Sequence, residues 1–82
     1  MTTAFPSASL AILVDQIAHA LRVRGWRLAT AESCTGGLVA ATLTAVAGSS
    51  DWFERGWVTY SNAAKTESID VPAVLIETEG AV

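Results

Sequence analysis

The sequence predicts an α/β fold in which helices cover a small sheet, because its apolar periodicity alternates between the helical repeat and short β-compatible runs. The expected helices cover residues 7–24, 36–48, 61–69 and 72–80, and the expected strands cover residues 26–32 and 55–60. Two strands do not form a sheet that is stable alone. The sequence therefore predicts the first half of a layered domain.

The first expected helix and strand have clear boundary signals. Ser7 or Ser9 caps the helix, which ends at Arg24 because Gly25 suits the position just past a helix end. Residues 26–32, "WRLATAE", are short and rich in apolar and β-compatible side chains. This composition predicts a buried strand.

The second expected helix, "GGLVAATLTAVAG", ends near Gly48 and is followed by "SSDW", which suits a loop or a brief turn. The second expected strand is "RGWVTY", residues 55–60, because aromatic and β-branched residues favour strands. Large aromatic side chains beside strands are usually part of the core rather than stacking surfaces for a ligand. This interpretation covers three residues: Trp26, Trp52 and Trp57.

Two short helices are expected after the second strand. Ser61 and Asn62 are N-cap candidates for residues 61–69, and Pro72 suits the first turn of residues 72–80. Helix and strand thus alternate as far as residue 69, and a second helix follows directly.

Composition and charge exclude several functional classes. The 82 residues are 51% apolar and 16% charged, unlike a disordered tail or a solvated linker. A net charge of −3, with five scattered Lys and Arg residues, argues against nucleic acid as the main partner. The N-terminal apolar stretch lacks a basic segment and is interrupted by Asp15, so we expect neither a signal peptide nor a membrane helix. The single Cys34 and the distant His19 offer neither a disulfide nor metal-ligand spacing, and a reducing cytoplasm is the simplest location.

The stretch "TAESCTGG" lies where the first strand is expected to become the second helix. Ser33 and Cys34 offer a hydroxyl and a thiol at this turn. Backbone N–H groups follow at Thr35, Gly36 and Gly37. Such a turn suits either nucleophilic catalysis or anion binding.

Three segments carry a resemblance to a known family: the AESCTGG turn, AGSS-x-WF-x-RG and VTYSN-x-x-K, which occur in order along the chain. The chain resembles the C-terminal domain of the competence/damage-inducible protein CinA, a family that includes stand-alone nicotinamide-nucleotide amidohydrolases. The resemblance implies a layered α/β/α sandwich of the CinA C-terminal type. Residues 1–82 would form a single partial domain, because the glycine-rich segment of the family's second half is absent.

The resemblance also implies hydrolysis of the carboxamide of nicotinamide mononucleotide to nicotinic acid mononucleotide and ammonia, with no metal or other cofactor. Covalent amide hydrolysis needs a nucleophile, a base, oxyanion donors and a proton for the leaving amine. In the light of the resemblance, Ser33 is the nucleophile, Lys65 is the base, and Tyr60 relays a proton or orients the lysine. A lysine in an apolar site gives up its proton more readily, so Lys65 has to be partly buried.

Each candidate also has a structural interpretation. Ser33 can cap the second helix, which is the ordinary use of serine there. Cys34 is a rival nucleophile, since a thiol at a helix N-terminus ionises more readily, but it lacks a histidine base, and buried packing is favoured instead. Lys65 can be a solvated side chain on the third helix.

Substrate-binding or oxyanion roles are predicted for six residues: Glu32, Thr35, Gly36, Gly37, Asn62 and Arg55. Glu32 either forms hydrogen bonds within the turn or is a surface acid. Thr35 positions substrate or caps the helix, and Asn62 contacts the nucleotide or begins the third helix. Arg55 is the phosphate candidate, although it can instead pair with a neighbouring acid.

Two functions of different class remain open. The first is an amidohydrolase half-domain acting on a small pyridine nucleotide, inactive until its second half is supplied. The second is a non-catalytic fragment or binding module that keeps the helix N-terminus as an anion site. The expected protein partner is the missing half of the domain or a second copy of the chain, with no nucleic acid and no membrane.

Overall fold

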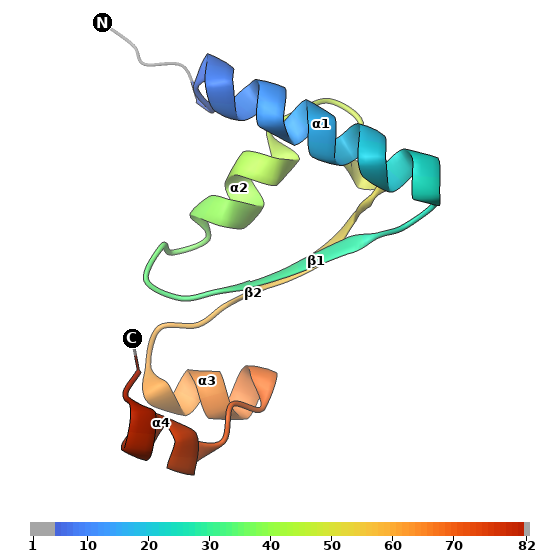
Figure 1. Ribbon diagram of the computed structural model, residues 1–82. Helices are drawn as coiled ribbons and strands as arrows, with labels where there is room; N and C mark the ends of the chain where they lie inside the picture. Colours follow the sequence, from blue (N-terminus) through green and yellow to red (C-terminus); the bar gives the residue numbers. More distant parts are fainter. Residues whose placement is uncertain (1–4, 82) are drawn as a thin grey trace, which may run out of the picture.

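The computed structural model describes residues 5–81 and places helices on both sides of a small sheet. Its elements are α1 (Ala8–Arg24), β1 (Leu28–Glu32), α2 (Leu38–Thr44), a short 3-10 helix (Ser49–Asp51), β2 (Phe53–Val58), α3 (Asn62–Ile69) and α4 (Ala73–Glu79). Figure 1 shows α1 and α2 on one side of the strands and α3 and α4 on the other. The α/β fold class predicted from the sequence is confirmed.

Helix α1 has the boundaries that its capping residues predict. The Ser7 side chain accepts a hydrogen bond from the backbone N–H of Leu10 at 3.4 Å. Gly25 lies in the left-handed region at φ 66°, and its N–H donates to the Arg22 carbonyl. The Arg22 guanidinium also reaches the loop before β2, where it donates to the Gly48 carbonyl at 3.1 Å and pairs with Asp51. Helix α1 is thereby linked to the start of β2.

Strands β1 and β2 pair in parallel, with Leu28 opposite Phe53 at one end and Glu32 opposite Val58 at the other. One further hydrogen bond, from the backbone N–H of Thr59 to the Glu32 carbonyl at 2.9 Å, follows the paired residues. The carboxyl ends of both strands therefore lie side by side, where α/β folds place their ligands.

Several elements begin or end a few residues from the predicted positions. Helix α2 covers Leu38–Thr44 rather than 36–48, because the two glycines before it adopt positive φ and remain in the turn. Strand β2 covers residues 53–58 rather than 55–60, since the hydrogen-bond ladder and not side-chain composition sets its ends. Pro72 is the N-cap of α4 rather than part of its first turn.

The core lies between α1, α2 and the start of β2. Its buried members are Val14, Ala18, Leu43 and Trp52, of which Trp52 is fully buried. Half-buried side chains pack around them: Ile17, Leu21, Leu28, Val46 and Phe53. The core covers only the α1 and α2 side of the sheet.

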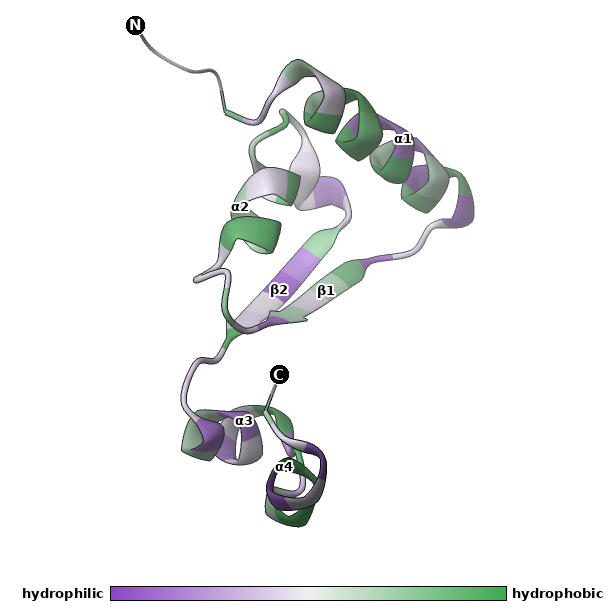
Figure 2. Cartoon of the chain, turned by 60° about the vertical axis from the view of Figure 1, so that its left-hand side comes forward, coloured by the Kyte–Doolittle hydropathy of each residue, from purple (hydrophilic) through white to green (hydrophobic). Residues whose placement is uncertain are grey.

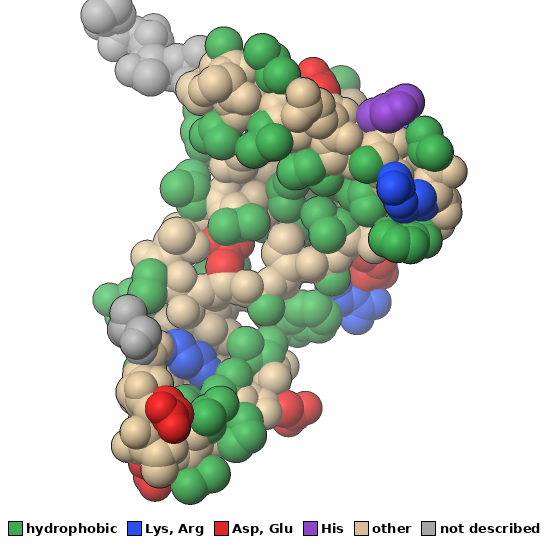
Figure 3. All heavy atoms as spheres, in the orientation of Figure 1, with side chains coloured by type: hydrophobic (Ala, Val, Ile, Leu, Met, Phe, Trp, Pro, Cys, Tyr) green, Lys and Arg blue, Asp and Glu red, His purple; other side chains and the backbone are tan. Residues whose placement is uncertain are grey.

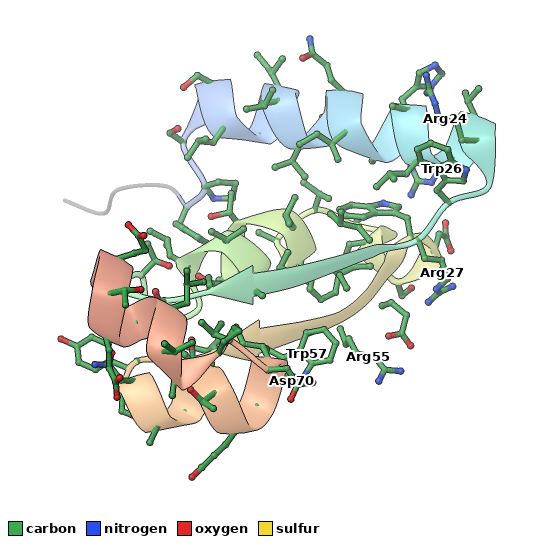
Figure 4. The ribbon with its side chains drawn as sticks, turned by 60° about the horizontal axis from the view of Figure 1, so that its bottom comes forward. Arg24, Trp26, Arg27, Arg55, Trp57 and Asp70 are labelled. Atoms are coloured by element: carbon green, nitrogen blue, oxygen red, sulfur yellow. The ribbon has the colours of Figure 1, made fainter. Side chains whose placement is uncertain are left out.

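Of the three tryptophans expected in the core, only Trp52 is buried. Trp26 is 62% exposed and Trp57 is 39% exposed, so the core interpretation was wrong for both. Each lies near an arginine instead: the Arg24 guanidinium is 5.8 Å from the Trp26 ring centre, and that of Arg55 is 5.9 Å from the Trp57 ring centre. Figure 4 labels both pairs, Arg24 with Trp26 near the end of α1 and Arg55 with Trp57 beside β2.

The molecule is more open than a compact domain of its length. Its radius of gyration is 15.3 Å, whereas about 12 Å is expected for a compact chain of this size. Helices α3 and α4 contact each other and form a layer apart from α1 and α2 (Figure 2). Among residues 5–81, no helix is long and apolar enough to cross a membrane.

A large apolar hollow of about 520 Å³ lies between α1, α2 and β1. Its lining includes Leu10, Leu13, Leu38 and Val39, each more than two-fifths exposed. Apolar side chains gather along α1 and between α1 and the strands on the face shown in Figure 3. This face lacks a covering layer within the described residues.

Candidate active site

A cavity of about 240 Å³ lies at the carboxyl ends of β1 and β2. Ser33 enters it from the turn after β1, and Lys65 enters it from α3. The remaining walls are Ala31, Glu32, Thr59, Ile69, Val71, Leu75, Ile76, Gly80 and Ala81. The cavity thus brings together two residues that are 32 positions apart in the sequence and were predicted to act as nucleophile and base.

Lys65 is buried, with 9% of its surface exposed. Ser61 caps α3 by accepting a hydrogen bond from the Ala64 N–H at 3.0 Å, which places Lys65 one turn into the helix. The Lys65 Nζ donates to the carbonyl oxygen of Ala81 at 3.2 Å. The interpretation of Lys65 as a solvated side chain is therefore wrong, and the burial that a base requires is present.

The turn after β1 leaves the Ser33 hydroxyl without a capping role. Helix α2 begins after Gly37, at φ 103°, with no side-chain hydrogen bond from its N-cap residue. The Ser33 Oγ lies 3.9 Å from the Cys34 Sγ, a weak contact. The alternative that Ser33 caps α2 is wrong.

Cys34 is exposed, so the expectation of buried packing is also wrong. The chain bends sharply at this residue, whose φ is 73°, and it lies at the corner of the turn. A non-glycine residue seldom adopts this left-handed conformation, and a bulky one adopts it less readily still.

The carboxylate of Glu32 caps α2 from the end of β1. It accepts hydrogen bonds from Thr35 Oγ1 at 2.7 Å and from the N–H groups of Val39 at 3.0 Å and Ala40 at 3.1 Å. The Thr35 hydrogen bond is the main reason that the pKa of Glu32 lies below its ordinary value; burial opposes the shift, and the backbone N–H groups reinforce it. Of the two interpretations of Glu32, the one with hydrogen bonds in the turn is confirmed and the surface acid is wrong; that this residue caps the helix was not predicted.

This cap bears on both roles proposed for the start of α2. The N–H groups of Val39 and Ala40, which an external anion would need, are already bound by Glu32. Among the described residues, the backbone N–H groups of Thr35 and Gly36 have no hydrogen-bond partner. These two N–H groups belong to the turn that carries Ser33, but neither residue lines the cavity, and the N–H groups at the start of the helix are occupied by Glu32.

Six of the predicted site residues do not line the cavity: Thr35, Gly36, Gly37, Tyr60, Asn62 and Arg55. Tyr60 is 79% exposed, and Asn62 borders a separate hollow between α3 and α4. Arg55 pairs with Glu54, and this ion pair lowers the pKa of the Glu54 carboxyl. The cavity in this half of the fold contains no arginine for a phosphate. Within the described range there is also no cluster of His, Cys, Asp or Glu side chains able to hold a metal.

The family profile described as "CinA C-terminal domain" matches residues 10–82. The chain belongs to this family. It is 54% identical over 70 residues to the nicotinamide-nucleotide amidohydrolase PncC of Escherichia coli K12, a match that covers 85% of this chain and 42% of that protein. It is 60% identical over 68 residues to a CinA-like protein of Citrifermentans bemidjiense, covering 83% of this chain and 16% of that protein.

Solved structures of the family share the fold. The competence/damage-inducible protein CihA of Agrobacterium tumefaciens superposes with a TM-score of 0.90 at 42% identity, over 99% of this chain and 48% of that one. The competence damage-inducible protein A of Klebsiella pneumoniae superposes with a TM-score of 0.85 at 44% identity, over 89% of this chain and 45% of that one. This chain thus spans less than half the length of these relatives.

Proposed function

We propose that the chain is the first half of a metal-independent amidohydrolase domain, which converts nicotinamide mononucleotide to nicotinic acid mononucleotide and ammonia. The observation that carries the proposal is the shared cavity of Ser33 and buried Lys65 at the carboxyl ends of the strands. The name of the Escherichia coli relative, a nicotinamide-nucleotide amidohydrolase, supports the substrate class.

In the proposed reaction, Lys65 Nζ takes the proton of Ser33 Oγ, and the oxygen forms a bond to the carboxamide carbon. Negative charge develops on the carboxamide oxygen, where the N–H groups of Thr35 and Gly36 can stabilise it. The C–N bond then breaks, and Lys65 returns the proton to the leaving ammonia. Water attacks the acyl-serine ester with Lys65 again accepting and returning a proton, which releases the acid and restores Ser33.

The cavity of this half is too small for the whole substrate. Its volume is about 240 Å³, whereas pockets for small ligands begin at about 300 Å³. We infer that a second half supplies the remaining walls and the phosphate contacts, and that the 82-residue chain alone is inactive. On this proposal, contacts with the second half also direct the Tyr60 side chain into the cavity, where it relays a proton or orients Lys65.

The alternative of an anion-binding module has less support. Its anion would compete with the Glu32 carboxylate for the N–H groups at the start of α2. A second negative charge beside Glu32 is electrostatically unfavourable.

The test is ammonia release from nicotinamide mononucleotide by the chain co-expressed with the second half of the Escherichia coli relative. Ser33→Ala should abolish this activity, and the neighbouring Cys34→Ala should retain most of it. Added chelator leaves the rate unchanged, because no step uses a metal. Turnover by Ser33→Ala at the wild-type rate would overturn the assignment of the nucleophile.

A further inference from the structure

The amine of Lys65 is held by the segment that follows α4. Its Nζ donates a hydrogen bond to the backbone carbonyl of Ala81 at 3.2 Å. Gly80 and Ala81 both line the cavity that contains Lys65 and Ser33. A backbone group 16 residues away in sequence therefore contacts the predicted base directly.

The backbone of Gly80 makes this contact possible. Its φ of 88° and ψ of 168° lie in a region almost confined to glycine. The Gly80 N–H donates to the Ile76 carbonyl at 2.9 Å and ends α4, and the chain then turns so that the next carbonyl meets Lys65. A Cβ at this position would meet no atom within 4 Å, so the requirement for glycine is conformational and not steric.

We propose that Gly80 and Ala81 are positioning residues for Lys65, an inference that rests on the proposed function. The lysine side chain is flexible, and holding one N–H restricts Nζ to the cavity shared with Ser33. A carbonyl oxygen accepts a hydrogen bond from an ammonium or from a neutral amine. The contact therefore persists through proton transfer and leaves the nitrogen electron pair available for the Ser33 proton.

Gly80→Ala tests the proposal, with Gly25→Ala as a matched control. Both glycines follow a helix, adopt positive φ and have open space where a Cβ would lie, but only Gly80 lines the cavity. Lys65 is the only lysine of the chain, so its amine can be followed alone. The measurement is the rate of reductive methylation of Lys65 by peptide mass mapping, in the complex with the second half.

We expect Gly80→Ala to raise the methylation rate about tenfold, as for loss of a hydrogen bond to a charged group. Gly25→Ala leaves the rate unchanged. D-alanine introduced at position 80 by ligation favours positive φ and preserves the slow rate, which separates loss of the turn from a general loss of folding. An unchanged rate in Gly80→Ala, or equal increases in both L-alanine variants, would overturn the inference.

A kinetic readout connects the contact to the reaction. Gly80→Ala should lower kcat with little change in KM, because positioning acts on the chemical step rather than on substrate binding. An unchanged kcat in a variant whose Lys65 methylates faster would also overturn the positioning role. Methylation is measured without turnover, so a wild-type complex that lacks amidase activity counts against the proposed function and not against the Lys65 contact.

Discussion

Lys65 illustrates how a single residue type can be identified in the sequence while its environment cannot. The VTYSN-x-x-K segment pointed to this residue. Its burial depends on α4 and on Ala81, whose carbonyl accepts the Lys65 hydrogen bond from 16 residues further along the chain. No local pattern around Lys65 encodes that contact. Its position on α3 was predictable, and its hydrogen-bond partner was not.

Replacing Lys65 tests its role as base. Lys65→Arg keeps a positive charge but cannot give up its proton at neutral pH, so we expect kcat/KM to fall about 10²- to 10⁴-fold, the usual contribution of a general base. Glu67→Gln, an exposed change on the same helix, should leave kcat/KM nearly unchanged. Turnover of nicotinamide mononucleotide by the complex is the measurement, and near-normal activity of Lys65→Arg would make the lysine purely structural.

Glu32 should make the stability of the fold depend on pH. Because its pKa is lower in the folded chain than the ordinary value of 4.5, the ionised carboxylate favours folding. This contribution is fully present above pH 4.5 and is lost as the pH falls through the lowered pKa. The measurement is urea denaturation at a series of pH values from about 6 down to about 3. Over this range, the unfolding free energy should fall less in Glu32→Gln than in the wild type.

The control for this experiment is Glu77→Gln on α4, where the carboxylate is exposed and caps no helix. We expect its pH dependence to match the wild type. Identical profiles for Glu32→Gln and the wild type would show that the cap does not contribute to stability.

At the scale of elements, the order of helices and strands was predictable, because amphipathic repeats, serine caps and glycine stops are local signals. Gly25 ends α1 as predicted, and of the candidate caps Ser7 rather than Ser9 and Ser61 rather than Asn62 fill the position. The start of α2 was misplaced. The carboxylate that caps this helix belongs to Glu32, which lies five residues before the N-cap residue Gly37. A cap from the preceding strand has no signature in the helix itself.

The pairing of β1 with β2 requires a glycine at one position. Gly56 lies opposite Thr30, and a Cβ at residue 56 would lie 2.6 Å from Thr30 Oγ1. Gly56→Ala should lower the unfolding free energy by about 1–3 kcal/mol, the usual cost of overpacking. Thermal or urea unfolding of the complex is the measurement.

A second substitution identifies the cause. The Thr30 hydroxyl is buried and has no hydrogen-bond partner among the described residues. In Thr30→Ala the oxygen is gone, so the double variant should be more stable than the sum of the two single effects predicts. Strict additivity would mean that Gly56 is required for another reason.

At the scale of the whole molecule, the apolar hollow between α1, α2 and β1 predicts association. Both strands have a free edge within the described residues, and exposed apolar surface beside such an edge promotes contact with other chains. We expect the 82-residue chain alone to be oligomeric or prone to aggregation in sedimentation velocity. With the second half of the Escherichia coli relative, it should form a soluble one-to-one complex.

A charged substitution in the hollow sharpens this test. Leu13→Glu places a charge in the hollow and should weaken the complex, whereas Asp15→Asn on the same helix, at an exposed residue that does not line it, should not. A monomeric, cooperatively unfolding 82-residue chain that hydrolyses nicotinamide mononucleotide would contradict the whole-molecule prediction.

The sequence by itself determined the α/β alternation, the family, and the caps of two helices to within a pair of candidates each, because these depend on periodicity and on residues close together in the chain. Tertiary structure alone decided that Lys65 shares a cavity with Ser33, that Glu32 caps α2, and that Trp26 and Trp57 are exposed. The physical reason is that burial and hydrogen bonding are set by the elements that pack together, and local sequence patterns do not specify which elements those are.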